Sequence, residues 1–436
     1  MTAKDRSAGA ATHAEAAGRL DLVGRIRCPH CWHRFRTEDI LWIAKHEDMR
    51  GDPVLGENEP LRFLPSRFNV DGEALDGRGM ACQQLACPSC HLLIPRVFLE
   101  AAPLIFSLIG VPASGKSYFL AAMTWGLSQL LPRKFLLAFN DVDPQGNQTL
   151  TDYVSTLFLQ PDENQLVGIE KTEMASDVTY AQVQISGQAI RLPRPFLFAL
   201  RPADGHPAAK KRGQASRILC LYDNAGEHFL PGMDRTLAPG TQHVARSRVL
   251  MFLYDPTQDA RFRHRCQQTS NDPQLQDAIR TPLQSGILTE AALRVQQYAG
   301  LSPSAKLDKP LLVLVSKSDI WKGLIDDDIV GEPYIDPSAP GEDAARVDLG
   351  RIERTSGKLR ELMLELAPEF VAAAEVFFRH VVYIPVSALG RSPQRQETTE
   401  MLLVRPKDIA PAWATVPIMY SFSKWSAGLV FAGSPA

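Results

Sequence analysis

The chain has 436 residues, of which 45% are hydrophobic and 22% are charged, a composition typical of globular proteins with two or three domains. Its formal net charge of −2 excludes a general electrostatic attraction to nucleic acid or to an anionic membrane, so we expect no clear nucleic-acid footprint. No apolar run approaches the roughly 18 to 20 residues of a membrane span, and the N-terminus lacks the apolar stretch of a secretory signal. We therefore expect a cytoplasmic protein in which residues 1–20 form a disordered lead-in.

Two CPxC sequences follow the lead-in. RCPHC contains Cys28 and Cys31, and ACPSC contains Cys87 and Cys90. Two such turns can bring four thiolates together around a tetrahedral Zn²⁺. We expect a structural rather than a catalytic ion, because four thiolates leave no open coordination position. An iron site of the rubredoxin kind uses the same ligands and stays open as an alternative. We expect a zinc-ribbon-like module over residues 21–100, with a Gly- and Pro-punctuated loop between the two pairs.

The stretch PLIFSLIGVPASGKSYFL, residues 103–120, predicts a buried strand, a glycine-rich turn and the start of a helix. It contains the spacing GxxxxGKS. In this motif the loop N–H groups bind phosphate, the lysine reaches the terminal phosphates and the serine hydroxyl ligates Mg²⁺. The flanking strand and helix are the context that the motif requires. The predicted phosphate-binding residues are Gly110, Ser114, Gly115, Lys116, Ser117 and Tyr118, with Lys116 also catalytic and Ser117 also a Mg²⁺ ligand.

A second buried strand is predicted by RILCLYD, which ends at Asp223 and is followed by Gly226. A DxxG sequence at a strand end can hold Mg²⁺ through its carboxylate and meet a γ-phosphate through the glycine N–H. Glu227 and His228 come next, and we hypothesise that one of them positions the attacking water once a partner protein is bound. The alternative is that both are exposed residues without a chemical role. Because a carboxylate repels a triphosphate, we expect slow intrinsic hydrolysis.

Two more buried strands end in polar residues, in PLLVLVSKSD and in HVVYIPVSALG. The Asp319 carboxylate could accept two hydrogen bonds from the guanine edge while the stem of Lys317 covers the ring. The alternative is that Ser318 or Asp319 caps the following helix. In the second sequence, the N–H of Ala388 could meet the guanine O6. The predicted base-contacting residues are Ser316, Lys317, Asp319, Ser387, Ala388 and Leu389.

The ordered set GVPASGKS, DNAGE, SKSD and SAL resembles the translation-factor and Ras-like (TRAFAC) class of P-loop GTPases, over roughly residues 104–430. This resemblance implies GTP and GDP as ligands together with Mg²⁺. The cysteine-rich front and the GVPASGKSYFLAAM segment resemble bacterial proteins of the double-GTPase group. That second resemblance implies a component of a multi-protein conflict or defence system, with protein partners that include another GTPase subunit.

The resemblance also implies individual roles. Asp223 would make the second Mg²⁺ contact, and Gly226 would contact the γ-phosphate. A switch threonine is expected between the P-loop helix and Asp223, where Thr172 is favoured over Thr179. Ser316 stands where the class usually has asparagine, so the bond that this asparagine makes between loops is weakened or replaced.

These patterns predict an α/β fold, with a mostly parallel P-loop NTPase (Ras-like GTPase) sheet flanked by helices and one antiparallel edge strand. We expect this domain over residues 101–436, with insertions at about 138–215, 256–305 and 322–350. The last insertion is acidic and Pro-rich, so we expect an exposed or disordered loop. The predicted function is a GTP-binding, slowly hydrolysing switch. The alternatives are an ATP-binding P-loop NTPase and a scaffold that binds nucleotide without hydrolysing it.

Overall fold

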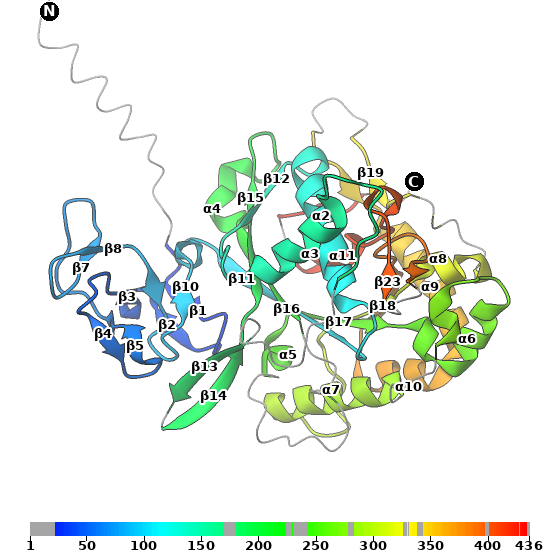
Figure 1. Cartoon of the computed structure of the whole chain (residues 1–436), viewed down its shortest axis with the longest axis horizontal. Coiled ribbons are helices and arrows are strands. Elements are labelled where there is room, and N and C mark those ends of the chain that lie inside the picture. Colours follow the sequence, from blue (N-terminus) through cyan, green and yellow to red (C-terminus); the bar gives the residue numbers. More distant parts are fainter. Residues whose placement is uncertain are drawn as a thin grey trace, which may run out of the picture.

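A seven-stranded sheet forms the centre of the larger part of the molecule, and a small strand-rich module lies beside it (Figure 1). No described helix is both long and apolar enough to cross a membrane. The computed structural model describes residues 22–169, 180–185, 187–223, 229, 242–277, 283–325, 329, 331–337, 343–396, 401–426 and 428–433.

The strands of the central sheet are β11 (Ala102–Gly110), β12 (Leu137–Asp141), β15 (Phe196–Pro202), β16 (Arg217–Asp223), β17 (Val249–Tyr254), β18 (Leu311–Val315) and β21 (Val381–Pro385). Their order is β12-β15-β16-β11-β17-β18-β21. The last five in this order are parallel to one another, whereas β15 is antiparallel to both of its neighbours. The predicted mostly parallel sheet is therefore confirmed. The expected antiparallel strand exists but is not the edge strand, because β12 pairs along its outer side.

The apolar runs form strands that are covered on both faces. In β16, Ile218, Cys220 and Tyr222 face the cluster shared with the N-terminal module, while Leu219 and Leu221 face the opposite cluster. Side chains alternate between the two faces of a strand, so a continuous apolar run suits a sheet with packing on each side. This arrangement fixes the carboxyl ends of the parallel strands along one edge.

Helices cover both faces of the sheet (Figure 1). One face packs against α2 (Lys116–Lys134), α3 (Gln148–Phe158) and α11 (Val416–Trp425). The other face, under β17 and β18, packs against α7 (Gln284–Ala299) and α10 (Pro368–Phe377), and α9 (Leu349–Leu366) lies along β21. Further α-helices in the described part of the chain are α4 (Arg212–Ala215), α5 (Gln242–Arg246), α6 (Ala260–Gln267) and α8 (Ser318–Trp321).

The expectation of a loop between the two cysteine pairs is wrong. The segment of residues 46–80, where the loop was expected, contains short antiparallel strands, and the buried carboxylates of Asp52 and Asp76 accept backbone N–H bonds at its turns. The module packs on the sheet face formed by β15, β16 and the start of β11. Its strands are β1 (Arg25–Arg27), β2 (Arg34–Arg36), β3 (Leu41–Ile43), β4 (Arg50–Asp52), β5 (Gly56–Pro60), β6 (Arg62–Phe63), β7 (Ala74–Leu75), β8 (Ala81–Cys82), β9 (Leu85–Ala86) and β10 (Leu93–Ile94).

The predicted insertions contain ordered elements. The first contributes β12 and β15 to the sheet, along with a hairpin of β13 (Tyr180–Ile185) and β14 (Gln188–Pro193). The third contains β19 (Tyr334–Ile335) and β20 (Arg346–Val347), and Ala345 and Val347 are buried in the main core. An exposed loop is therefore wrong for these described residues. A last hairpin joins β22 (Gln394–Arg395) and β23 (Leu402–Leu403).

Candidate nucleotide site and cysteine centre

The glycine-rich turn connects the end of β11 to the start of α2. Gly115 caps the helix at φ +89°, a left-handed conformation that favours glycine. At Gly110 a Cβ atom would lie 2.9 Å from the Leu253 carbonyl oxygen and 3.1 Å from Ser114 Oγ, so a larger residue would force the turn to move. Both glycines of the motif are thus needed for the shape of the turn.

The Lys116 side chain folds back over this turn. Its Nζ donates to the carbonyl oxygens of Gly110 at 3.2 Å and Val111 at 3.0 Å. Ser114 Oγ is buried and has no hydrogen-bond partner in the described part of the chain. Ser117 and Tyr118 follow in the first turn of α2, whose N–H groups and dipole favour an anion. The turn therefore offers both a cation and unpaired polar groups to a phosphate.

Asp223 ends the neighbouring strand at the same edge of the sheet. In the register of β11 and β16, Asp223 lies opposite Leu108, two residues before Gly110. Its Oδ1 is buried without a hydrogen-bond partner among the described residues. Burial raises the pKa of the Asp223 carboxyl, and the charge of Lys116 opposes this rise. Because an unpaired buried carboxylate is costly, a divalent cation at this place would stabilise it.

The Lys317 side chain is fixed by the end of the adjacent strand. Its Nζ lies 2.8 Å from Asp255 Oδ2 and 2.9 Å from Thr257 Oγ1. Lys317 lies in the turn between β18 and α8, where its backbone has the left-handed conformation with φ +55°. The sequence analysis missed Asp255 and Thr257, although an aspartate directly after the buried strand β17 is the same signal that identified Asp223.

Asp319 and Ser387 follow the neighbouring parallel strands β18 and β21 and lie in contact with each other. Ser387 Oγ donates to Asp319 Oδ1, and the N–H of Gly390 donates to Ser387 Oγ at 2.8 Å. Burial raises the pKa of the Asp319 carboxyl, and the Ser387 bond counteracts this effect. Since Ser387 uses one carboxylate oxygen, the other can accept bonds from a ligand. Ala388 and Leu389 follow Ser387 and are partly buried against the main core.

Ser316 does not use its side chain to join the loops. Its Oγ is buried without a partner among the described residues, while its N–H donates to the Tyr254 carbonyl at 2.9 Å. Its own carbonyl accepts from Trp321 Nε1 at 2.8 Å. The loops are instead joined by the Lys317–Asp255 ion pair and by the bond from Ser387.

Five candidate residues from the sequence analysis lie outside the described part of the chain: Thr172, Thr179, Gly226, Glu227 and His228. In the described segment that ends at Ile169, the N–H of Ile169 donates to the Tyr118 hydroxyl of α2 at 2.8 Å. A side chain at Gly168 would collide with Leu403. Tyr118 therefore holds the described chain at Ile169 against α2.

The two cysteine pairs meet in the N-terminal module. All four sulfur atoms lie within 4.8 Å of one another, with 3.7 Å between Cys28 and Cys90 and between Cys31 and Cys87. The N–H groups of His30 and Ser89 donate to the sulfurs of Cys28 and Cys87. Such bonds stabilise thiolates, and the spacing suits a tetrahedral ion with metal–sulfur distances of about 2.3 Å. The donor set therefore fits a structural metal ion.

Comparisons with known proteins give a weak likeness. No protein-family model matches the sequence, and no curated protein matches it. Among solved structures, the signal recognition particle receptor complex SRβ-GTP/SRX from Chaetomium thermophilum matches with TM-score 0.24 and 13% identity, over 67% of this chain and 94% of that one. The S. cerevisiae Ski7 GTPase-like domain bound to GTP matches with TM-score 0.25 and 12% identity, over 68% and 47%.

Translation elongation factor SelB from Methanococcus maripaludis, solved with the GTP analogue GPPNHP, matches with TM-score 0.20 and 9% identity. This match covers 66% of the present chain but only 30% of the elongation factor. Scores this low carry no functional conclusion.

Proposed function

We propose that the chain is a guanine-nucleotide-binding switch that hydrolyses GTP slowly. One observation carries the proposal: the glycine-rich turn, Asp223 and the Asp319–Ser387 pair all follow parallel strands and so lie along one edge of the sheet. Ligands of open α/β sheets bind at this edge. In this arrangement the phosphates occupy the turn and the base lies beside Asp319.

Each part of the site has a defined task in the proposal. Lys116 moves from the loop carbonyls to the terminal phosphates, and Ser117 and Asp223 hold Mg²⁺ directly or through water. Bound Mg²⁺ would neutralise charge on the phosphates. Asp319 accepts bonds from the guanine edge, an arrangement that adenine does not offer, and the Asp255 carboxylate keeps the stem of Lys317 in place.

Hydrolysis is assigned to the residues after Asp223. Glu227 or His228 would orient the attacking water once a partner protein is bound, and the γ-phosphate would order the chain around Thr172. Single-turnover hydrolysis in Glu227→Ala tests this step. Loss of turnover with retained nucleotide affinity supports the assignment, whereas unchanged turnover removes Glu227 from it.

Thermal unfolding in the presence of nucleotide tests the function as a whole. At a ligand concentration of about 100 Kd, GTP or GDP with Mg²⁺ should add about 2.7 kcal/mol to the free energy of unfolding. ATP at the same concentration should add little. Equal stabilisation by ATP would favour an ATP-binding NTPase, and stabilisation by GTP without any turnover would favour a scaffold.

A further inference from the structure

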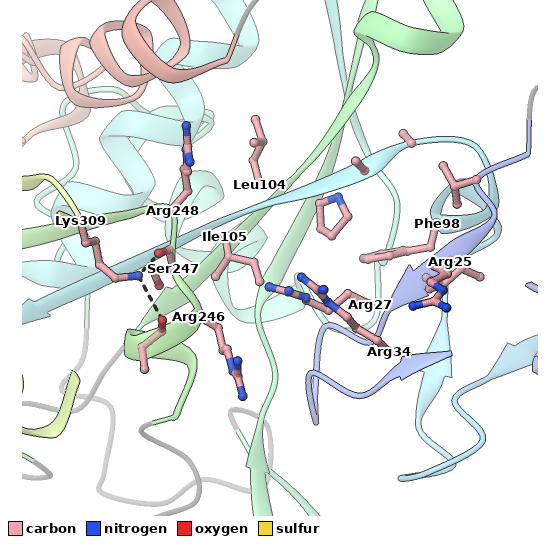
Figure 2. A pocket seen from close by; sticks show the side chains of 16 residues that line it. Arg25, Arg27, Arg34, Phe98, Leu104, Ile105, Arg246, Ser247, Arg248 and Lys309 are labelled. Atoms are coloured by element: carbon pink, nitrogen blue, oxygen red, sulfur yellow. Dashed lines mark hydrogen bonds between the residues drawn. The ribbon is translucent and has the colours of Figure 1, made fainter. Parts of the chain in front are cut away.

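A cleft of about 580 Å³ lies between the N-terminal module and the sheet, and six cationic side chains line it (Figure 2). They come from three separate parts of the chain: Arg25, Arg27, Arg34, Arg246, Arg248 and Lys309. None of the described residues that line the cleft is acidic. Such a gathering is unexpected in a chain with a net charge of −2.

One wall is the hairpin of β1 and β2, next to the first cysteine pair. Arg27 lies directly opposite Arg34 in the antiparallel register. Like charges that face each other across strands destabilise a sheet. Ile26 and Phe35 are buried on the other face of the hairpin, which holds the arginines on the cleft side. No ion pair between described residues neutralises Arg25, Arg27 or Arg34, so an anionic ligand can do so.

The opposite wall is the turn after α5. Ser247 is buried and its Oγ donates to the His243 carbonyl at 2.8 Å, while the N–H of Arg248 donates to the Ile105 carbonyl at 2.8 Å. Because Ser247 is anchored inward, its neighbours Arg246 and Arg248 are both exposed. In the view of Figure 2, Arg248 lies above β11, whereas Arg246 lies below it, on the same side as Arg27 and Arg34.

Lys309 completes this wall. Its Nζ donates to the carbonyl oxygens of Ala245 and Ser247, which fixes the turn against the start of β18. Burial, Arg248 and Arg246 together lower the pKa of Lys309 to about 8. The positive charges are therefore close enough to destabilise one another, and an anion between them would relieve this repulsion.

We propose that this cleft binds the phosphodiester backbone of a single nucleic-acid strand, without regard to base sequence. Exposed arginines on two walls suit a row of phosphates. The floor between them is apolar, with Leu104 and Ile105. The aromatic residue of the lining, Phe98, is buried, so its ring is not offered to a base for stacking. This set of side chains therefore suits contacts to the phosphodiester backbone of the strand rather than to its bases.

The cleft is separate from the proposed guanine-nucleotide site. It is lined by residues 101–105 at the start of β11, whereas the glycine-rich turn follows Gly110 at the other end of that strand. The two proposals can therefore fail independently. Part of the lining comes from the module and part from the sheet domain, so the full chain is needed for the test.

Fluorescence anisotropy of the full-length protein with a labelled single-stranded RNA of mixed sequence, about 20 nucleotides long, tests the proposal. Two double variants remove two charges from either wall: Arg27→Gln with Arg34→Gln, and Arg246→Gln with Arg248→Gln. The control, Arg261→Gln with Arg265→Gln, removes two exposed arginines from α6, which lies at the far end of the molecule (Figure 1).

We expect each cleft variant to bind RNA about tenfold more weakly, and the slope of log K against log salt to fall by about 1.4, or about 0.7 for each lost contact. The control should stay within about twofold of the parent, and GTP-dependent stabilisation should be unchanged in all variants that melt as the parent does. Equal losses in the control, no RNA binding at about 50 mM salt, or displacement of RNA by an equal concentration of tripolyphosphate would each overturn the proposal. The last result would assign the cleft to a small polyphosphate.

Discussion

Tyr222, the residue before Asp223, donates its hydroxyl hydrogen to the carbonyl oxygen of Pro29, inside the first cysteine turn. Trp32 Nε1 donates to the same hydroxyl at 3.2 Å, and the His243 ring stacks on the Tyr222 ring with 4.6 Å between centroids. The strand that carries a predicted Mg²⁺ ligand is therefore joined to the cysteine centre by buried polar contacts.

Replacing Tyr222 by phenylalanine tests this connection. The change leaves two buried polar groups, the Pro29 carbonyl and the Trp32 indole N–H, without their partner, so we expect a loss of about 1 to 3 kcal/mol in the free energy of unfolding. Urea denaturation measures it. Tyr383→Phe is a matched control, because the Tyr383 hydroxyl is buried without a partner among the described residues. A loss of equal size in both variants would contradict the role of the Tyr222 bonds.

We expect a structural metal ion at the cysteine centre, and its removal should unfold the N-terminal module. Structural Zn²⁺ supplies about 10 to 16 kcal/mol of apparent folding energy in small zinc domains, so we expect Cys90→Ser to lower the melting temperature and the metal content together. Elemental analysis should find one zinc per chain. Iron, with visible absorption, is the other outcome that four thiolates allow, and parent protein that contains no metal would contradict the centre. Cys266→Ser, at a buried cysteine outside the cluster, should keep its metal.

Replacing Lys116 by alanine should weaken binding of the phosphates. Lys116 is the cation within the glycine-rich turn, and loss of a charged contact to phosphate should weaken GTP binding by at least about tenfold. Lys134→Ala, at the other end of α2, removes the same side chain from an exposed ion pair with Asp336 and should bind GTP normally. Isothermal titration of both variants decides between a phosphate contact and a general charge effect.

Guanine binding should weaken on acidification. Burial raises the pKa of Asp319, whereas the Ser387 bond and the charge of Lys317 oppose the rise and Asp272 adds to it. For an acid with a raised pKa in the folded state, ionisation reduces the stability of the ligand-free protein as the pH rises through that pKa. The guanine contact needs the ionised form of Asp319. As the pH is lowered, GDP affinity should therefore begin to fall before the pH reaches about 4, where an ordinary carboxyl group titrates.

The Ser387→Ala variant provides the control for this pH effect. Loss of the Ser387 hydroxyl removes a hydrogen bond that lowers the pKa of Asp319. On acidification, the fall in GDP affinity should therefore begin at a higher pH than in the parent. Titrations with labelled GDP across the acidic range measure the midpoint. An unchanged midpoint would show that another group controls the loss of binding.

Local sequence determines much of the candidate site. Gly110, Lys116, Asp223 and Asp319 were found because each follows a buried apolar run, and parallel strands bring their carboxyl ends to one edge. The cysteine cluster could be predicted for a similar reason, since each CPxC turn supplies two thiols at a fixed spacing.

Contacts between distant segments could not be predicted in this way. The pairing of Lys317 with Asp255 depends on the register of β17 and β18 rather than on a motif. The cationic cleft joins residues from Arg25 to Lys309, and no short stretch of sequence shows it. The overall charge gave no sign of the cleft, because net charge averages over the surface and the fold decides where charges gather.

The proposed function depends on recognition of guanine by Asp319. Titration of GTP and xanthosine triphosphate into the parent protein and into Asp319→Asn tests it most directly, because xanthine presents a carbonyl where guanine has an amine and can pair with an amide. We predict that the parent prefers GTP and that the variant reverses this preference, with a change of at least about tenfold in the ratio of affinities, as expected for exchange of a charged hydrogen bond. An unchanged ratio in the variant would contradict the account.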